Sequence, residues 1–257
     1  VAEPGCNFMD ILEPTIGGIV RGKLKSAPAN IQTKLKLPMD KGTKADLPSL
    51  DKIFVGVGWD MGNKDKASGK GGAEPVEIDL DVSAVLFAEG ARSMGAVYYN
   101  NTRQFGISHT GDNTTGAGEG DDEVIKVEML RIPEIVQQIH FIINIYTKDV
   151  SFESLQNAYC RVFDAQGYEL ARYELGNWRD GELSASGLVL ARLVRSEKTK
   201  KWYFQAIGAF CPGRRWMDRR CIEEMEMLFR KSPKEIQQLR FGGKTGAAKK
   251  QDSVKAE

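Results

Sequence analysis

The sequence predicts a mainly β protein, an antiparallel β-sandwich with short helices and one amphipathic helix near its C-terminal end. Two observations support this class. Short runs of β-branched and aromatic residues recur along the chain, separated by turns rich in Gly, Asn and Asp. The runs are not separated by the long amphipathic segments that parallel βαβ units need between their strands. Two packed antiparallel sheets therefore account best for the pattern.

Residues 1–50 are expected to be an N-terminal extension. Scattered Pro and Gly residues interrupt two stretches, 18–24 and 33–37, which alternate like half-exposed strands and are expected to join the sandwich. A buried strand, Lys52–Trp59, begins the main domain, because its Ile, Phe, Val and Trp residues crowd together without a helical period. The loop that follows, residues 61–75, is rich in Gly, Lys and Asp and is expected to be exposed.

Nine further strands are expected before residue 212, so that the main domain covers residues 51–212. Each is a short β-type run bounded by turn residues. The expected strands are 76–88, 96–100, 106–109, 124–130, 139–146, 157–164, 168–175, 186–195 and 201–209.

An amphipathic helix is expected over residues 213–232. Four apolar residues recur at spacings of 4, 4 and 3 and would form one stripe along it, and Pro233 would end it. These four are Met217, Cys221, Met225 and Leu228. Residues 233–257 are expected to be a disordered tail.

The charge and cysteine patterns limit the class of function. The 257 residues are 41% hydrophobic and 28% charged, with a net charge of +1, and no apolar run reaches the roughly 18 residues of a membrane span. The four cysteines form no C-x-x-C pair, so they predict neither a zinc ribbon nor a redox motif and are expected to be reduced. No secretory signal is seen, and we expect a cytoplasmic protein.

The C-terminal segment is basic, with 12 basic and 7 acidic residues from Gly213 onward. It is the expected contact for a protein partner or for the anionic inner face of a membrane. No strong nucleic-acid signal accompanies it, because a solvated helix face explains its arginines and Trp216 more simply.

A glycine-rich acidic segment lies between two expected strands. Residues 112–123 carry five carboxylates and no basic residue, and such a density of like charge is unfavourable without a cation. Calcium takes 6 to 8 oxygen ligands, and glycines let backbone carbonyls turn toward one point. The segment is not an EF-hand, because Ala117 stands where that loop requires glycine. Its composition leaves two interpretations, a calcium site of another kind or a solvated acidic turn.

A second acidic element precedes the loop. Glu77, Asp79 and Asp81 alternate along an expected strand and would share one face, while the residues between them point into the core. Asp79 and Asp81 together with the loop acids give seven carboxylates, enough for two calcium ions at about three or four each.

Several motifs occur in a fixed order along the chain. They are Gly56-Val-Gly-Trp-Asp60, Asp79-Leu-Asp-Val-Ser-Ala84, Tyr99-Asn-Asn101 and the segment His109–Glu123. In this order they resemble the TerD family of tellurium-resistance and stress proteins, over about residues 50–210. The resemblance implies a β-sandwich that binds calcium, commonly two ions, and that works as a binding or scaffold module rather than as an enzyme.

The resemblance also implies a set of calcium ligands. It comprises Asp79, Asp81, Asp112, Asn113, Asp121, Asp122 and Glu123, a carbonyl from Gly118, and more peripherally Asp60 and Asn144. Glu119 belongs to the same set, although the family usually has an aspartate there, so its side chain is one methylene longer.

Two other functions stay open. A metal-dependent enzyme such as a calcium-assisted hydrolase, or a sensor of an anionic or phosphorylated small molecule, would need an open metal position facing a deep pocket. A membrane or nucleic-acid adaptor would use the basic helix. His109, next to the acidic loop, is expected to have a structural rather than a catalytic role.

Overall fold

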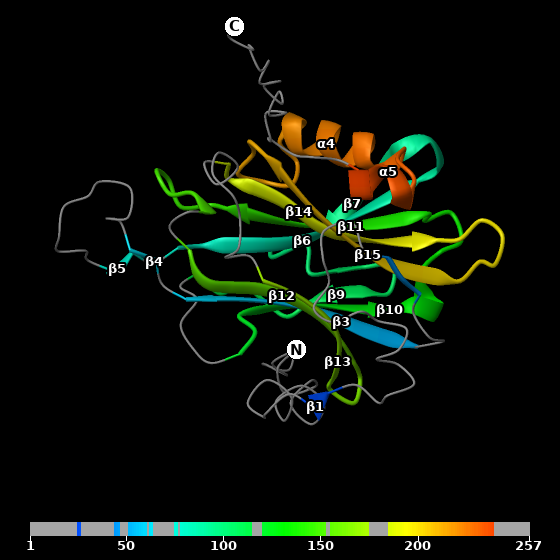
Figure 1. Cartoon of the computed structure of the whole chain (residues 1–257), viewed down its shortest axis with the longest axis horizontal. Coiled ribbons are helices and arrows are strands. Elements are labelled where there is room, and N and C mark those ends of the chain that lie inside the picture. Colours follow the sequence, from blue (N-terminus) through cyan, green and yellow to red (C-terminus); the bar gives the residue numbers. More distant parts are fainter. Residues whose placement is uncertain are drawn as a thin grey trace, which may run out of the picture.

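The computed structural model describes residues 25–26, 44–46, 51–60, 62–63, 75–76, 78–114, 120–152, 155–174 and 185–238. Two β-sheets pack face to face, and two helices cover the outer face of one sheet (Figure 1). The predicted β-sandwich is therefore confirmed. Within these ranges, no helix combines the length and the apolar character needed to span a bilayer.

The first sheet has seven strands in the order β1-β13-β12-β3-β10-β9-β8. Its neighbours pair antiparallel, except that β1 pairs parallel with β13. The strands are β1 Lys25–Ser26, β3 Lys52–Asp60, β8 Arg103–Gln104, β9 Ile107–His109, β10 Glu123–Glu128, β12 Gln156–Asp164 and β13 Tyr168–Glu174.

The second sheet has six strands, all antiparallel, in the order β2-β15-β14-β11-β6-β7. They are β2 Lys44–Asp46, β6 Leu80–Ala88, β7 Arg92–Val97, β11 Gln138–Ile145, β14 Gly187–Arg195 and β15 Trp202–Cys211. Four short elements of the described residues lie outside the two sheets or between their strands. They are the small pair β4 Gly62–Asn63 with β5 Pro75–Val76, and the 3-10 turns Glu89–Ala91 and Met129–Arg131.

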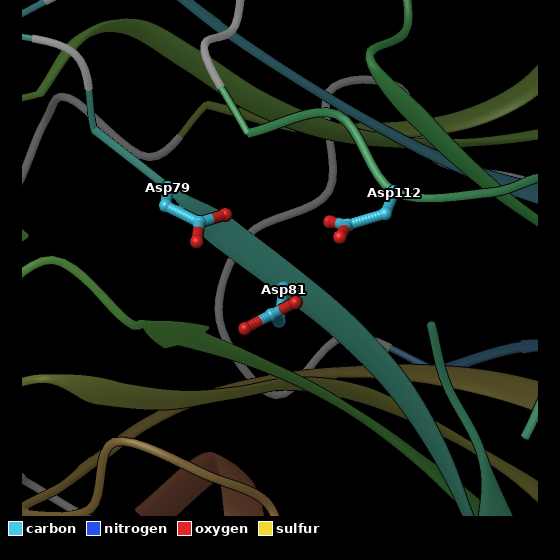
Figure 2. A group of neighbouring side chains, drawn as sticks. All are labelled: Asp79, Asp81 and Asp112. Carbon is cyan, nitrogen blue, oxygen red and sulfur yellow. The ribbon is translucent and has the colours of Figure 1, made fainter. Parts of the chain in front are cut away.

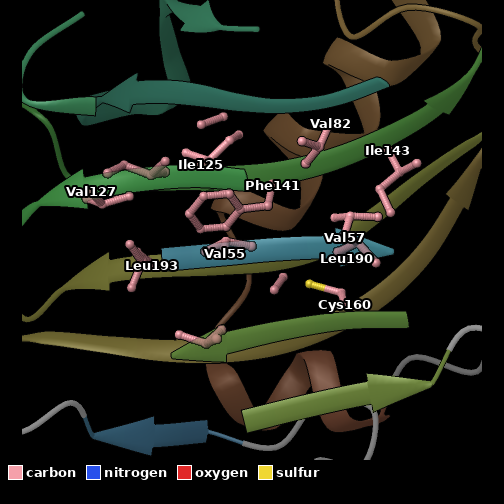
Figure 3. Close-up of a cluster of buried hydrophobic side chains, with 14 of the residues drawn as sticks. Val55, Val57, Val82, Ile125, Val127, Phe141, Ile143, Cys160, Leu190 and Leu193 are labelled. Atoms are coloured by element: carbon pink, nitrogen blue, oxygen red, sulfur yellow. The ribbon is translucent and has the colours of Figure 1, made fainter. Parts of the chain in front are cut away.

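The main core lies between the two sheets, where alternate residues of facing strands meet (Figure 3). Val55 and Val57 of β3 and Phe141 and Ile143 of β11 are examples. The residues between them on β11 are buried too, because helix α4 and its neighbours cover the outer face of the second sheet. This double burial explains why the segment reads as a continuous apolar run rather than as an alternating one.

Helix α4, Arg219–Phe229, packs on the second sheet through Cys221, Met225 and Leu228, as the apolar stripe predicts. The assignment of Met217 to this stripe is wrong. Met217 is 44% exposed, because the helix begins at Arg219 rather than at residue 213. A turn precedes the helix instead.

The start of that turn is fixed by one carboxylate. Asp218 Oδ2 accepts hydrogen bonds from the backbone N–H groups of Arg214, at 2.8 Å, and Arg215, at 3.1 Å. These N–H groups therefore point toward Asp218 and are satisfied without a further helical turn.

The prediction of a disordered tail is wrong for its first residues. Helix α5, Pro233–Gln238, follows α4 directly, and Ile236 is buried beneath it. Ser232 and Glu235 form a capping box, in which each backbone N–H donates to the other side chain. Pro233 occupies the first helical position, where its missing N–H costs nothing. Residues 239–257 lie outside the described part of the chain.

The expected N-terminal strands 18–24 and 33–37 also lie outside the described residues, as does nearly all of the loop 61–75. Two other pieces of the N-terminal stretch do join the sandwich. β1 pairs with β13 at one edge of the first sheet, and β2 pairs with β15 at one edge of the second.

A buried arginine fastens the helices to the sheet. Arg192 on β14 is 1% exposed, and its guanidinium donates to the backbone carbonyls of Leu228, at 2.6 Å, and Lys231, at 2.8 Å, and to Gln205 Oε1, at 2.9 Å. Carbonyls at a helix C-terminus carry partial negative charge, so they serve in place of a carboxylate. Burial nevertheless lowers the pKa of Arg192 to about 10.

Replacing this arginine is expected to loosen the helices. Arg192→Met keeps much of the apolar stem but leaves the helix carbonyls without donors, which should cost about 3 kcal/mol of unfolding free energy in urea melts. Arg219→Met is the matched control, because Arg219 is exposed and pairs with Glu223 in solvent. The control should keep its unfolding midpoint. Equal midpoints for both variants would show that Arg192 does not fasten the helices.

Candidate metal site

Three carboxylates meet where β6 begins. Asp81 lies on β6 and Asp79 two residues earlier, directly before the strand begins, while Asp112 comes from the loop after β9. Each offers an oxygen, and these oxygens lie within 4.8 Å of one another. Figure 2 shows the Asp112 carboxylate pointing toward the other two. Over the ranges that the structure covers, this is the one cluster of three or more such ligands.

The cluster is electrostatically uncompensated. Burial, followed by the charges of Glu123, Asp79 and Asp112, raises the pKa of Asp81 to about 8. Burial, followed by the charges of Asp112 and Glu123, raises the pKa of Asp79 to about 6. Burial and the neighbouring acids both oppose the charged forms of these carboxyls, so a cation would stabilise the site.

Two oxygens beside the cluster have no hydrogen-bond donor among the described residues. One is Asp79 Oδ1, which is buried. The other is Oδ1 of Asn144, which lies directly opposite Asp81 in the β6–β11 ladder and is 1% exposed. Buried oxygens of this kind normally have a partner, and oxygen is the ligand that calcium takes. The residues present therefore fit a hard cation.

The backbone around Asp79 is held by β11 and the turn after it. The N–H of Tyr146 donates to the Asp79 carbonyl, and the Asp79 N–H donates to Thr147 Oγ1, both at 2.9 Å. These bonds continue the pairing of β6 with β11 to Asp79, one residue before β6 begins. Asp79 is thus placed on a fixed backbone rather than on a free loop.

Glu123, predicted as a ligand, has a different position. It is fully buried, and its carboxylate accepts from the backbone N–H groups of Val82, at 2.7 Å, and Asn113, at 3.5 Å. His109 Nε2 lies 3.3 Å from Glu123 Oε2. Because the Gly111 N–H donates to His109 Nδ1, the ring proton lies on Nε2 and faces the carboxylate. Glu123 therefore holds the strand and loop in place, and His109 supports it, which indicates a structural role for that histidine.

Asp121, predicted as a ligand, does not lie among the three carboxylates. Its two oxygens accept a bidentate pair of hydrogen bonds from Arg161, both at 2.6 Å, and the Tyr159 hydroxyl donates to Oδ1 at 3.1 Å. Both charged side chains are buried. A cation placed at Asp121 would meet the guanidinium at close range, so this carboxylate is a partner for Arg161 instead.

Asp122 and Asn113 form a separate group on the loop. Asp122 accepts from the Trp59 backbone N–H, at 2.9 Å, and from Asn113 Nδ2, at 2.8 Å. Burial raises the pKa of Asp122 to about 6, the Trp59 bond opposes the rise, and the charges of Asp121 and Asp60 add to it. Asp60 ends β3 and is exposed. Gly118 and Glu119 lie outside the described residues.

Glycines explain how the loop lies flat on β3. A Cβ on Gly56 would overlap the Asp121 carboxylate, and one on Gly58 would approach the Tyr159 hydroxyl and the Gly120 carbonyl to 2.6 Å. Side chains at either position would lift the loop off the strand. These two glycines therefore serve close packing of the loop.

Sequence reasoning missed three residues that support the site. They are Arg161, Trp59 and Thr147. Trp59 Nε1 donates to the Ile78 carbonyl at 2.8 Å and so connects the end of β3 to the segment that carries Asp79. Only Arg161 left a signal, because a cation in the apolar run of β12 requires a buried anion nearby.

A family model and several known proteins match this chain. The model, described as TerD domain, covers residues 35–214 and so begins inside the predicted N-terminal extension. Tellurium resistance protein TerZ of Serratia marcescens is 36% identical, over 65% of this chain and 83% of its own length. Stress response protein SCP2 of Bacillus subtilis (strain 168) is 33% identical, over 68% of this chain and 92% of its own length.

Solved structures show the same fold. The crystal structure of SAV2460, a protein of unknown function, aligns with a TM-score of 0.55 at 20% identity, over 68% of this chain and 98% of that chain. A homologue of telluride resistance protein TerD from Streptomyces coelicolor A3(2) aligns with a TM-score of 0.52 at 20% identity, over 65% of this chain and 93% of that chain.

The raised pKa of Asp81 predicts a pH-dependent stability. In the unfolded chain this carboxyl has its ordinary pKa, so between about pH 4 and pH 8 the folded state binds more protons, and the unfolding free energy falls as the pH rises. In EDTA, the melting temperature should drop between pH 5 and pH 8 by on the order of 5 °C more than in Asp81→Asn. Parallel pH profiles for the two proteins would show that Asp81 ionises freely.

Proposed function

This chain belongs to the TerD family, and we propose that it is a calcium-binding module of a stress response, with Asp79, Asp81 and Asp112 at the centre of its ion site. The observation that supports the proposal is the approach of three carboxylates to within 4.8 Å, where burial and neighbouring acids raise the pKa of Asp79 and Asp81. The names of two relatives, a tellurium resistance protein and a stress response protein, support the proposed role in a stress response.

Calcium suits this site better than other common cations. Carboxylate and amide oxygens are hard ligands, and histidine and cysteine are absent from the cluster of described residues. Asp81 is buried while Asp112 is exposed, so one side of the cluster is open to solvent. Calcium tolerates an irregular shell of protein and water oxygens, whereas magnesium requires a tight octahedron.

A bound ion would supply positive charge, and the proposed function requires no bond-breaking step. Asp81 belongs to β6 of the second sheet and Asp79 directly precedes that strand, while Asp112 follows β9 of the first sheet. Neutralising the three would therefore connect the sheets at this end of the sandwich. We propose a binding or scaffold role for the module rather than catalysis.

A second ion remains part of the proposal. Asp122, Asn113 and Asp60 lie together near the described end of the acidic loop, and the raised pKa of Asp122 supports a local need for positive charge. Gly118 and Glu119 would complete this second position. The stoichiometry of binding distinguishes one ion from two.

Part of the positive charge in the basic C-terminal segment is paired with acidic side chains. Three of its arginines pair with acidic neighbours, which reduces the local positive field. The pairs are Arg215–Asp218, Arg219–Glu223 and Arg230–Glu226. We propose that the basic C-terminal segment from Gly213 onward is the contact for a protein partner or for the anionic inner face of a membrane, in the cytoplasm.

Calcium titration by calorimetry, with magnesium as the comparison ion, tests the proposed site. Calcium should bind, and magnesium should bind more weakly or give no heat. At about 100 times its dissociation constant, calcium should add on the order of 2.7 kcal/mol of stability to the native protein. Equal heats for both ions, or none for calcium, would contradict the proposal.

Two aspartate variants separate this site from general charge effects. Asp81→Asn keeps the size of the side chain and removes one charge from the cluster, so calcium affinity should fall by about tenfold or more while the ion-free protein melts higher at pH 8. Asp51→Asn is the control. Asp51 lies just before β3, at the opposite end of that strand from Asp60. It removes the same charge and should leave calcium binding unchanged. Equal losses of affinity in both variants would place the ion elsewhere.

A further inference from the structure

Two buried thiols meet where the end of β15 faces the start of α4. Cys211 ends β15, Cys221 lies in the first turn of α4, and their Sγ atoms are 3.2 Å apart. Both residues are almost closed to solvent, at 2% and 0% exposed. Cys160, the third cysteine of the described residues, is buried in β12 of the other sheet.

The backbone around the two sulfurs is built from glycine. A Cβ on Gly187 would lie 2.7 Å from Cys211 Sγ, and a Cβ on Gly213 would overlap Cys221 Sγ. Larger residues at either position would push the sulfurs apart. The close approach of the thiols therefore depends on two glycines from different segments.

We infer that Cys211 and Cys221 form a redox modification site, at which an oxidant of the hydroperoxide class joins them in a disulfide that fastens α4 to the second sheet. A disulfide has an S–S distance of about 2.05 Å, so the sulfurs need to approach by roughly 1 Å. The first turn of a helix can supply such a shift more easily than the interior of a sheet, because its N–H groups lack helical partners.

The surroundings make Cys221 the first sulfur to react. Cys221 lies in the first turn of α4 with Asn144 Nδ2 3.7 Å from its Sγ atom, whereas Cys211 ends a β-strand. The N-terminal end of a helix stabilises a thiolate. Cys221 is thus the better nucleophile, and Cys211 is the resolving thiol.

The reaction balances as a two-electron oxidation. The Cys221 thiolate attacks one oxygen of the hydroperoxide, the O–O bond breaks, and Cys221 becomes a sulfenic acid while water or an alcohol leaves. Cys211 then attacks the Cys221 sulfur, the S–O bond breaks, and the departing hydroxide takes the Cys211 proton to form water. Two thiols lose two electrons and two protons, and one hydroperoxide is reduced.

The proposed disulfide would join the TerD domain to the helix that follows it. The TerD match ends at residue 214, so Cys211 lies inside the matched domain and Cys221 lies beyond it. In the reduced protein, α4 is held by packing and by the bonds from Arg192. Oxidation adds a covalent bond at the opposite end of the helix from those carbonyls.

The test is a peptide map of the native full-length protein after hydrogen peroxide. Free thiols are alkylated with iodoacetamide, the protein is digested with trypsin, and the peptides are weighed. Residues 202–214 and 221–230 should appear as one cross-linked mass that dithiothreitol separates, and the oxidised protein should melt on the order of 5 °C higher than the reduced one.

Three variants define the site. Cys211→Ala and Cys221→Ala should each lose the cross-link and the rise in melting temperature, while Cys160→Ala should keep both. The peptide map of the wild-type protein tests the inference even if a cysteine variant fails to fold. Alkylation of both Cys211 and Cys221 after peroxide treatment, or oxidation of Cys221 to a sulfinic acid without a cross-link, would overturn the inference.

Discussion

The buried carboxylate of Glu123 is the interaction on which the acidic end of this sandwich depends. It extends from β10 of the first sheet to the backbone N–H of Val82 in the second, and it also accepts from Asn113 in the acidic loop. A buried carboxylate is costly unless donors surround it, so the strand, the loop and His109 are all required to stay near it. One side chain thereby fixes the relative position of three segments.

The position of Glu123 also contributes to the repulsion among the acids of the neighbouring cluster. Holding the loop against β6 brings Asp112 to Asp79 and Asp81, and the charge of Glu123 adds to the rise in the pKa of the last two. A protein selected for stability alone would replace Asp81 with a neutral residue. An acid placed at a cost in stability is typical of a binding site, where a ligand restores the stability that the empty site loses.

The sequence predicted the acidic strand correctly, because period-two alternation requires Asp79 and Asp81 to share a face. It did not separate the loop acids by role. Asp112 and Asp121 occur in the same glycine-rich segment, yet only the first reaches the cluster, since Arg161, forty residues away in sequence, captures the second. Long-range pairing of this kind leaves no local pattern. Helix α5 is different, because its Ser-Pro-Lys-Glu capping box could be read from the sequence.

Asn144 lies next to both Asp81 and Cys221 at this end of the second sheet. Its Nδ2 donates to the Gly213 carbonyl, at 2.7 Å, and lies beside Cys221 Sγ, while its Oδ1 has no donor among the described residues. The residue directly opposite it in the ladder is Asp81. An amide presents donors on one side and an acceptor on the other, so Nδ2 can donate to the Gly213 carbonyl while Oδ1 still offers an acceptor. Neither a carboxylate nor an apolar residue at position 144 would offer both, because a carboxylate has no donor for the Gly213 carbonyl and an apolar side chain has neither a donor nor an acceptor.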